Sequence, residues 1–356
     1  MNRREFAQIS ALAAFGFALP ASLNAFHKSG KRIKVGVIGT YHSHTEDKIN
    51  TLIYLNDIYE LIAVAEEDAV RRNNSIGFSN YGKINWITKR ELLSRQDLNA
   101  VLIESSMDDL LSDALEAVEA GKHIHIDNPP GRNLENLKYV LNEATKNDLA
   151  FQLGYFTRYN NAVIALKKFL SEGIIGDVFE IDGVFSKKIP DSRRESIKKY
   201  YGGSMFFLGC YLIELVVSIF GFPESIKTYC RNSLNQADGL LDNQLAILEY
   251  KNCIASLRSS LLEIDGETRR HIDFVGTNGT LEINPFEPGE LYLTLGKSSG
   301  NYSAGRNRIA LPLQSDRYSA QLKDFAAMIR KEKPVYYGAR KEIEIHETLL
   351  KASNLF

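Results

Sequence analysis

The chain has 356 residues, of which 44% are hydrophobic and 24% charged, a globular composition with enough length for two domains. Lysine and arginine number 43 and aspartate and glutamate 44, so the formal net charge is −1. A chain with this balance has no overall basic field for collecting nucleic acid or anionic lipid, which argues against a nucleic-acid partner. The three cysteines form no CxxC pair and are too few for a disulfide framework or a structural zinc site.

The N-terminus has the features of an export signal. Arg3 and Arg4 precede an apolar stretch at Ile9–Leu19, and small residues follow up to Ala25. The stretch is shorter than the roughly 20 residues that span a bilayer, so a signal peptide is favoured over a retained membrane anchor. We therefore predict a twin-arginine signal over residues 1–25, a periplasmic location, and no membrane attachment once the signal is removed.

Residues 32–153 alternate between short apolar runs and segments with helical spacing. The runs predict buried strands, and Gly121 closes one of the helices between them. This alternation is typical of a doubly wound parallel sheet, so we predict a Rossmann domain that binds a dinucleotide. The predicted strands are 33–39, 59–65, 100–103, 123–126 and 150–155, and the predicted helices are 45–55, 110–118 and 133–147.

Residues 154–356 have a different pattern, which predicts an α+β domain with a large, mostly antiparallel open sheet. Asn278-Gly279 between two apolar runs indicates a hairpin with a type I′ turn. We expect the outer face of this sheet to be buried in a homo-oligomer. The predicted strands are 177–185, 226–231, 244–250, 254–260, 272–275 and 280–283, and the predicted helices are 161–172, 203–220, 319–330 and 340–350.

The end of the first predicted strand carries a partial dinucleotide motif. From Gly39 the chain reads Gly-Thr-Tyr-His-Ser-His, which keeps only the first glycine of Gly-x-Gly-x-x-Gly. Glu66 ends the second strand, where an acidic residue accepts hydrogen bonds from the adenosine ribose. These positions favour NAD over NADP, although Arg71 and Arg72 lie close enough in sequence to accommodate a 2′-phosphate.

Several ordered motifs resemble the Gfo/Idh/MocA family from about Lys34 to the C-terminus. They are Gly121–Pro130, Gly202–Glu214, Asp242-Asn243, Gly276–Thr280 and Leu349–Ser353. The resemblance implies an NAD(P)-dependent oxidoreductase that transfers hydride at a carbon of a carbohydrate or polyol. The residues assigned to cofactor binding are Gly36, Gly39, Thr40, Tyr41, Glu66, Ser105, Asp127 and Pro129.

Four polar positions of the family are altered in this chain. Asn128 stands where the family has its lysine, Phe207 replaces an aspartate, Tyr211 replaces a histidine, and Leu110 aligns with another histidine. A neutral amide stabilises a developing alkoxide less well than an ammonium does. Tyr211 is therefore the predicted proton carrier, with its pKa lowered by a nearby imidazolium, and Asn128 and His44 complete the predicted catalytic set.

The histidines leave a second chemistry open. His42 and His44 lie in the first loop, and His123, His125 and Asp127 share one face of the fifth strand. Such a group could bind a metal. We expect no metal and assign His42 to the substrate instead.

Three further features border the predicted cleft. Arg158, with Asn160 nearby, either contacts the substrate or pins the interface between the domains. Tyr201, next to Tyr200, is a candidate for stacking on a sugar ring. The basic run of Lys187, Lys188, Arg193 and Arg194 is interpreted as a solvated loop, which would favour an anionic or heavily hydroxylated substrate if it folded over the cleft.

Three functions remain open on the sequence. The first is the exported oxidoreductase, with NAD as cofactor and a small carbohydrate as substrate. The second is a pseudoenzyme that binds nucleotide or sugar without turnover, which the altered positions Leu110, Asn128 and Phe207 favour. The third is a metal-dependent lyase or hydrolase built on His42 and His44.

Overall fold

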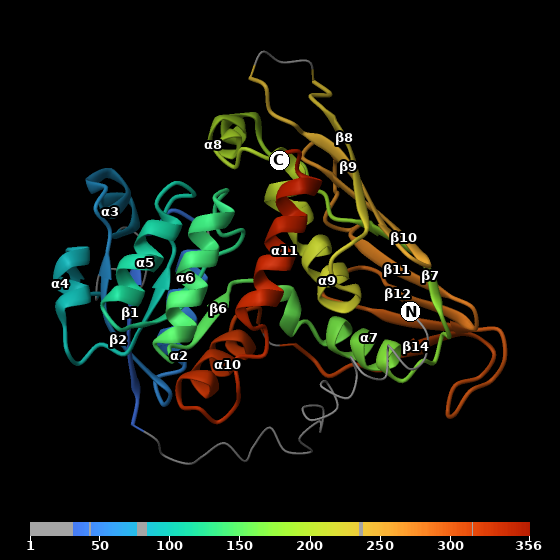
Figure 1. Ribbon diagram of the computed structural model, residues 1–356, viewed down its shortest axis with the longest axis horizontal. Helices are drawn as coiled ribbons and strands as arrows, with labels where there is room; N and C mark the ends of the chain where they lie inside the picture. The colour runs from blue at the N-terminus through green and yellow to red at the C-terminus, as the bar shows by residue number, and fades with distance from the viewer. Residues whose placement is uncertain (1–30, 43, 77–83, 235–237, 315) are drawn as a thin grey trace.

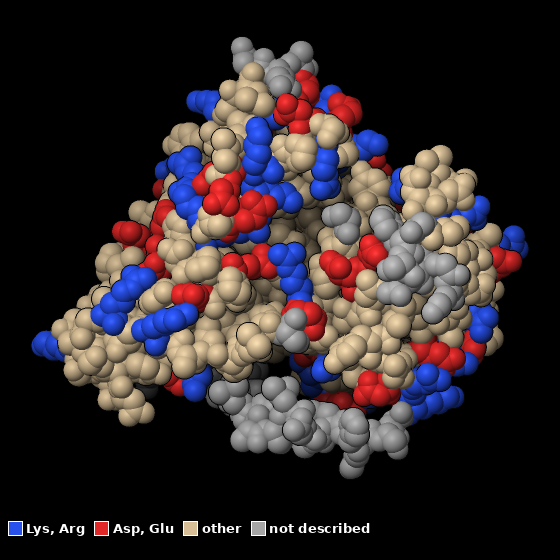
Figure 2. Space-filling model, turned by 180° about the vertical axis from the view of Figure 1, so that it is seen from behind, with Lys and Arg blue, Asp and Glu red and all other residues tan. Residues whose placement is uncertain are grey.

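A computed structural model describes residues 31–42, 44–76, 84–234, 238–314 and 316–356. The predicted signal peptide, residues 1–25, lies outside the described residues. Among the described helices, none is both long and apolar enough to cross a membrane. On the face shown in Figure 2, basic and acidic side chains are interspersed, in keeping with the near-neutral charge.

The first domain is built on a six-stranded sheet in the order β3-β2-β1-β4-β5-β6, with every pairing parallel. The predicted doubly wound architecture is confirmed, and the strand order reverses between β1 and β4. Its strands are β1 (Ile33–Ile38), β2 (Tyr59–Ala65), β3 (Trp86–Ile87), β4 (Ala100–Ile103), β5 (His123–Ile126) and β6 (Phe151–Leu153), and its helices are α2 (Thr45–Tyr54), α3 (Ala69–Ile76), α4 (Lys89–Ser94), α5 (Leu110–Glu119) and α6 (Leu134–Lys146).

Burial explains why the apolar runs form these strands. All four residues of β4 are buried, as are five of the six residues of β1. Helix α4 was missed because it spans only six residues, but its N-terminus has a full capping box between Thr88 and Glu91. The Thr88–Glu91 spacing was therefore the available signal for this helix.

The second domain holds an eight-stranded sheet in the order β14-β13-β12-β11-β7-β10-β9-β8. Its pairings are antiparallel except for the parallel pair of β7 and β10, which confirms the predicted open sheet. The strands are β7 (Val178–Val184), β8 (Ser225–Arg231), β9 (Asn243–Tyr250), β10 (Cys253–Ser260), β11 (His271–Gly276), β12 (Gly279–Ile283), β13 (Leu291–Leu295) and β14 (Gly305–Ile309).

The hairpin between β11 and β12 forms as predicted, but its turn is not type I′. A type I′ turn needs positive φ at both central residues, and neither Asn278 nor Gly279 has one. Gly279 is needed for close approach instead, because a Cβ there would lie 2.2 Å from the carbonyl oxygen of Thr294 on β13. The glycine thus allows the next strand to pair.

Helices fill the space between the two sheets, as Figure 1 shows. Buried side chains from both domains form one continuous core there. Helix α10 returns to the first domain, where Leu322 and Phe325 pack with residues of β1 and β2, and the Tyr59 hydroxyl donates to the Leu322 carbonyl at 2.6 Å. The remaining helices are α7 (Asn161–Ser171), α8 (Arg194–Lys198), α9 (Cys210–Phe220), α10 (Ser319–Ile329) and α11 (Ala339–Ala352).

The segment before α9 departs from the single helix predicted over 203–220. Met205–Gly209 forms a π-helical turn, after which α9 begins at Cys210. Gly203 has a φ of +64°, and a Cβ there would lie 2.2 Å from the Leu241 carbonyl oxygen. This entry brings Phe207 and Tyr211 to the cavity described next.

Candidate functional site

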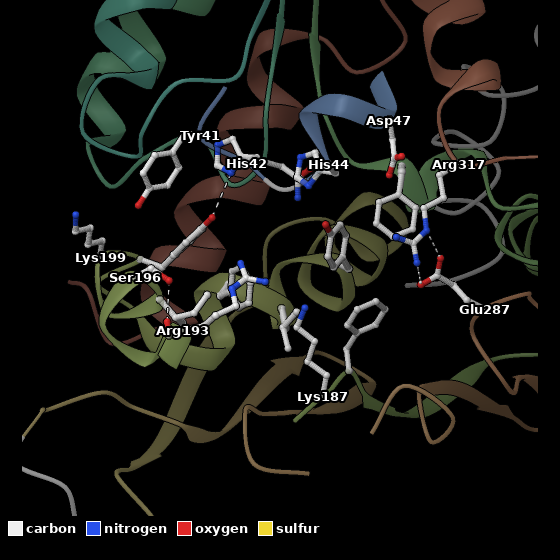
Figure 3. Close-up of a pocket in the computed structure, with 18 of the residues that line it drawn as sticks. Tyr41, His42, His44, Asp47, Lys187, Arg193, Ser196, Lys199, Glu287 and Arg317 are labelled. Carbon is white, nitrogen blue, oxygen red and sulfur yellow. Dashed lines mark hydrogen bonds and ion pairs between the residues drawn. The ribbon is translucent and has the colours of Figure 1, made fainter. Parts of the chain in front are cut away.

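A cavity of about 430 Å³ lies between the two domains (Figure 3). The first domain lines it with residues that follow the carboxyl ends of β1, β2 and β5. The second domain adds aromatic side chains and several cations. The first-domain residues are Tyr41, His42, His44, Asp47, Arg71 and Asn128.

The loop after β1 is tied to its neighbours by its own backbone. Gly39 has a φ of +85°, and a Cβ there would lie 2.6 Å from the backbone of Ser105. The Thr40 N–H donates to the Glu66 carboxylate at 2.8 Å, and the Tyr41 N–H donates to the Glu104 carbonyl at 3.0 Å. The turn needs a glycine, as predicted, but two of its N–H groups are already used.

Glu66, predicted to bind a ribose, is already bonded to groups of the protein. The side chain is buried, and one oxygen accepts from both the N–H and the hydroxyl of Thr40. The other oxygen accepts from the Asp68 N–H, while Arg71 lies 3.4 Å from the carboxylate. Glu66 therefore holds the β1 loop against the end of β2.

His42 bridges the two domains. Its Nε2 lies 3.0 Å from the Ser105 carbonyl oxygen, so this nitrogen carries the proton, and Nδ1 accepts from the Tyr200 hydroxyl at 3.2 Å. Burial lowers the pKa of His42 to about 4, which keeps the imidazole neutral. His42 is thus a structural bridge that also lines the cavity, rather than a cation that activates a neighbour.

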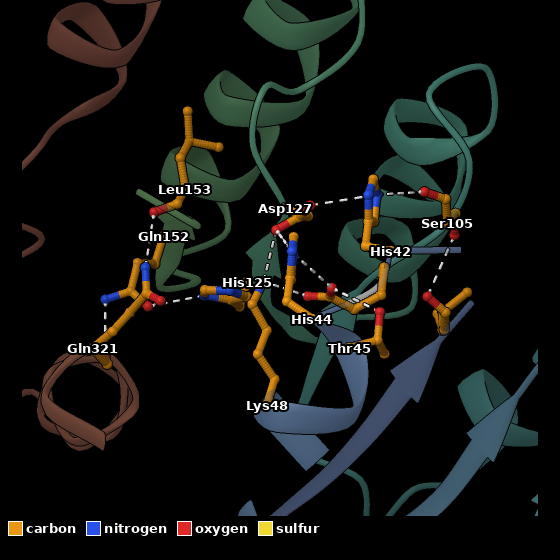
Figure 4. Close-up of polar contacts among 12 residues, drawn as sticks. His42, His44, Thr45, Lys48, Ser105, His125, Asp127, Gln152, Leu153 and Gln321 are labelled. Atoms are coloured by element: carbon orange, nitrogen blue, oxygen red, sulfur yellow. Dashed lines mark hydrogen bonds and ion pairs between the residues drawn. The ribbon is translucent and has the colours of Figure 1, made fainter. Parts of the chain in front are cut away.

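Beneath His42 and His44 lies a buried charge cluster that the sequence analysis missed (Figure 4). The Lys48 ammonium is 2.6 Å from Glu104 and 2.7 Å from Asp127, and all three side chains are at most 1% exposed. Burial lowers the pKa of Lys48, but Asp127 and Glu104 outweigh it and raise that pKa above its ordinary value. The available signal was the four-residue spacing of His44 and Lys48, which aligns them on one face of α2.

His44 connects this cluster to the cavity. Its Nε2 donates to Asp127 at 3.0 Å, and its side chain remains 29% exposed. Burial alone would raise the pKa of Asp127, but His44, Lys48 and His42 together hold it well below its ordinary value. The ionised Asp127 fixes the His44 tautomer and leaves Nδ1 to accept a proton, which is the arrangement of an oriented general base.

Tyr211 lines the cavity as predicted, but its surroundings do not lower its pKa. Its ring packs against Phe156 and Phe185, with centroid distances of 4.9 and 5.1 Å. Burial raises the pKa of Tyr211 well above 10, and the neighbouring Asn128 amide only partly opposes this. The predicted lowering by an imidazolium is therefore wrong, because the nearby His42 and His125 are buried and neutral.

Two predicted substrate residues lie outside the lining of the cavity. Arg158 binds Glu342 through both terminal nitrogens, at 2.6 and 2.8 Å, and Glu214 through Nε at 3.0 Å. Glu214, on α9, and Glu342, on α11, both belong to the second domain, so these bonds hold helices of that domain together rather than pinning the interface between the domains. Tyr201 hydrogen-bonds Asp108 and stacks against Arg132, whereas its neighbour Tyr200 faces the cavity.

The basic run divides in two. Lys187 and Arg193 line the cavity, so the run is not simply a solvated loop. Arg194 is buried and binds Asp238 at 2.8 Å and Asp242 at 3.1 Å, and Lys188 is exposed outside the lining. Helix α8 thus borders the cavity through Ser196 and Ile197, while Arg193, just before the helix, is the nearby member of the run that lines it.

Other residues predicted to bind the cofactor make packing contacts and hydrogen bonds around the cavity. A Cβ at Gly36 would lie 2.7 Å from the Leu92 side chain, so this glycine serves packing. The Ser105 hydroxyl bonds Asp113, while the Ser105 carbonyl holds His42. Pro129 is buried after a cis peptide bond with Asn128. Of the eight residues assigned to the cofactor, Tyr41 is the one that lines the cavity among the described residues.

A metal ion would have to compete with existing bonds. The ligand atoms of His42, His44 and Asp127 lie within 4.8 Å of one another. His42 Nε2, however, is committed to the Ser105 carbonyl, and Asp127 is already paired with the Lys48 ammonium. His123 and His125 are engaged with the Ala150 N–H and the Gln152 amide. The donor set favours a proton relay over a metal centre.

A nicotinamide dinucleotide fits this cavity by its position. The lining runs from Arg71, in the helix after β2, to Asn128, after β5, across the point where the strand order reverses. Open parallel sheets bind dinucleotides at this point. Because the N–H groups of Thr40 and Tyr41 are already bonded, the pyrophosphate would rely on other donors, and Arg71 supplies a cation on this side.

Comparisons with known proteins agree with this architecture. The profile of the GFO/IDH/MocA C-terminal domain matches residues 163–282. Trans-1,2-dihydrobenzene-1,2-diol dehydrogenase of Bos taurus is 24% identical over 227 residues, which cover 63% of this chain and 66% of the bovine enzyme. The chain thus spans just under two thirds of that relative.

Two solved structures share the fold over most of their length. A putative NADPH-dependent oxidoreductase from Desulfitobacterium hafniense superposes with a TM-score of 0.78 at 16% identity, covering 91% of this chain and 96% of that one. UDP-N-acetylglucosamine 3-dehydrogenase GnnA from Acidithiobacillus ferrooxidans gives 0.74 at 16% identity, covering 91% and 97%. At these identities the two likenesses show a shared fold, and the profile match shows that residues 163–282 are similar to a GFO/IDH/MocA C-terminal domain.

Proposed function

We propose that this protein is an NAD(P)-dependent oxidoreductase that interconverts a hydroxyl and a carbonyl group on a small carbohydrate or polyol. The observation that carries the proposal is the His44–Asp127 pair, which opens onto a cavity at the carboxyl edge of the parallel sheet. The named activities of two similar proteins, a dihydrodiol dehydrogenase and a UDP-sugar 3-dehydrogenase, support this reaction class.

Bound NAD(P) supplies the acceptor or donor of the hydride. Tyr41 and Arg71 would hold its adenosine side, and Asn128 would lie toward the nicotinamide, in line with their places after β1, β2 and β5. Glu66 and Asp68 both lie within 3.4 Å of Arg71. A 2′-phosphate would have to compete with these carboxylates for Arg71, so we retain the preference for NAD over NADP.

The proton moves through His44. In the oxidative direction, Nδ1 of His44 takes the proton of the substrate hydroxyl as the hydride leaves its carbon. Asp127 accepts the Nε2–H bond and stabilises the imidazolium that forms. The Lys48 ammonium keeps Asp127 ionised from below, so Lys48 is a positioning residue that acts through Asp127.

Tyr211 orients the substrate rather than carrying the proton. With its pKa raised well above 10, its hydroxyl stays protonated near neutrality and can donate a hydrogen bond to the substrate oxygen. The family's lysine is absent at Asn128, and the ammonium that pairs with Asp127 is the buried Lys48. The site thereby replaces an exposed ammonium with a histidine backed by a buried one.

The test compares His44→Gln with Tyr211→Phe on a panel of sugars and polyols. We expect His44→Gln to lower kcat by about 10²–10⁴-fold, the usual range for losing a general base, with NAD binding retained. Tyr211→Phe should keep the wild-type pH profile and lose about tenfold in kcat/KM, as for one missing hydrogen bond. Equal turnover of His44→Gln and wild type would remove His44 from the mechanism.

A pseudoenzyme is the second candidate, favoured by the occupied N–H groups of Thr40 and Tyr41 and by Asn128. Titration of NAD and NADP against the wild-type protein, together with a turnover assay on the panel, separates the two candidates, because a pseudoenzyme binds nucleotide or sugar without turnover. The oxidoreductase requires saturable binding of at least one of them, together with turnover of one substrate in the panel. Binding of sugar without either cofactor would favour the pseudoenzyme.

A further inference from the structure

The second-domain side of the cavity carries an excess of positive charge. Three of its cations, Lys187, Arg270 and Arg317, come from the second domain and line the cavity (Figure 3). One carboxylate on this wall, Glu287, is shared by the two arginines. Arg317 binds it through two nitrogens, at 2.7 and 2.9 Å, and Arg270 reaches it at 3.3 Å.

Lys187 is the one of these three cations that does not pair with Glu287. Among the described residues it takes part in no ion pair, and its ammonium lies 5.4 Å from the centre of the Phe207 ring. The side chain is half-buried, and Arg270 and Arg193 are close enough to repel it. A partly desolvated ammonium held among guanidinium groups is unfavourable by itself and is stabilised by an anion that enters between them.

The wall is apolar where it is not cationic. Arg270 packs over the Phe185 ring at 4.3 Å, and Arg317 packs over the Phe156 ring at 5.1 Å. These contacts fix the guanidinium groups beside aromatic rings, a combination that suits a sugar ring carrying an oxyanion. Phe207, where the family has an aspartate, removes a negative charge that would repel such a ligand.

We infer that the substrate is an anionic carbohydrate, with a carboxylate or phosphate bound by Lys187 and the neighbouring Arg270 and Arg317. This rests on the proposed function, because it places the ring of that substrate between His44 and the cationic wall. The phosphates of the dinucleotide belong instead to the sheet side of the cavity, near Arg71.

Binding to the purified protein, measured by calorimetry, tests the inference without depending on turnover. The probes are glucuronate, glucose 6-phosphate and the neutral methyl glucoside, each with and without NAD. We expect at least one anionic probe to bind about tenfold or more tightly than the neutral one, and to weaken as salt is raised. Preference for glucuronate identifies a carboxylate as the ligand group, and preference for glucose 6-phosphate a phosphate.

Lys187→Met should weaken the anionic probe about tenfold and leave methyl glucoside unchanged. Lys188→Met is the matched control, because it removes the same charge one residue away, outside the lining. The inference is overturned if no probe shows an anionic preference, if both variants weaken binding equally, or if Lys187→Met weakens NAD binding instead. Anion-selective binding without any turnover would contradict the proposed function while leaving this inference intact.

Discussion

Two buried cations in different domains have similar surroundings, because each lies between two carboxylates. Lys48 lies between Glu104 and Asp127 in the first domain, and Arg158 lies between Glu214 and Glu342 in the second. Each trio is almost fully buried. The difference is what lies above it, because Arg158 is covered by the Tyr337 ring at 3.7 Å, whereas the Lys48 cluster reaches the cavity through His44.

This difference separates a structural ion cluster from a functional one. A closed cluster, one without access to the cavity, cannot act on a ligand. It contributes to the stability of the fold and to the selection of a single packing arrangement. An open cluster, one with access to the cavity, can act on a ligand through His44, because His44 and Lys48 both pair with Asp127 and His44 is 29% exposed. Similar electrostatics therefore serve different purposes according to access.

Breaking the closed cluster should have the largest effect. Arg158→Met leaves two buried carboxylates without a partner, and we expect it to lower the free energy of unfolding by about 3–5 kcal/mol. Chemical denaturation followed by circular dichroism measures this loss. A control variant, Arg340→Met, removes a 93% exposed arginine and should change stability by less than about 0.5 kcal/mol. A loss for Arg158→Met as small as the control's would show that the cluster is not structural.

Breaking the open cluster should lower stability less, by about 3 kcal/mol, because His44 and His42 can still compensate Asp127. Lys48→Met should also raise the pKa of Asp127, and with it shift the acidic limb of the pH–rate profile upward. The pH profile is the readout that a merely structural role would not move. If Lys48→Met lowers stability and leaves that profile in place, Lys48 does not act through Asp127.

The smallest expected effect is a change in how the free energy of unfolding depends on pH. Burial lowers the pKa of His42 to about 4 and that of His346, on the helix that carries Glu342, to about 3. As the pH decreases from about 6.5 to 5, the unfolded chain binds protons at these histidines and the folded chain does not. The free energy of unfolding therefore decreases by about 1.4 kcal/mol per pH unit for each fully titrating histidine.

His346→Leu should flatten this slope by about one proton without affecting turnover, since His346 lies outside the cavity lining. Urea unfolding at several pH values measures the slope. His271→Gln is the opposing control, because hydrogen bonding to Asp182 raises the pKa of His271. An unchanged slope in His346→Leu would mean that this histidine is not held neutral.

Much of the fold could be predicted from sequence because several first-domain strands are continuous apolar runs and several second-domain strands alternate between buried and less buried residues. β2, β4 and β5 have the predicted bounds, since their burial leaves little freedom in where they end. β14 was missed because its sequence, Gly-Arg-Asn-Arg-Ile, is mostly exposed and polar and carries no apolar alternation. The helical π-turn at Met205–Gly209 depends on tertiary contacts, such as the Met205 N–H bond to Gln244, which no local pattern contains.

The site was less predictable than the fold. His42, His44, Tyr41, Asn128 and Tyr211 line the cavity as the motifs suggested. Lys48 escaped notice because a lysine in a helix is normally solvated, and its burial depends on carboxylates 56 and 79 residues away. The bonds of Glu66 to Thr40 and Asp68 could not be predicted, because the motif records which residue stands at the strand end but not which groups it contacts.

The return of α10 to the first sheet has a consequence for how the chain is made. The core of the first domain contains Leu322 and Phe325, and the Tyr59 hydroxyl is satisfied by a carbonyl 263 residues further along. A ribosome that has released residues 31–153 has therefore not yet supplied one side of that core. The first domain therefore cannot complete its core until α10 has been made, so its folding is coupled to synthesis of the second domain.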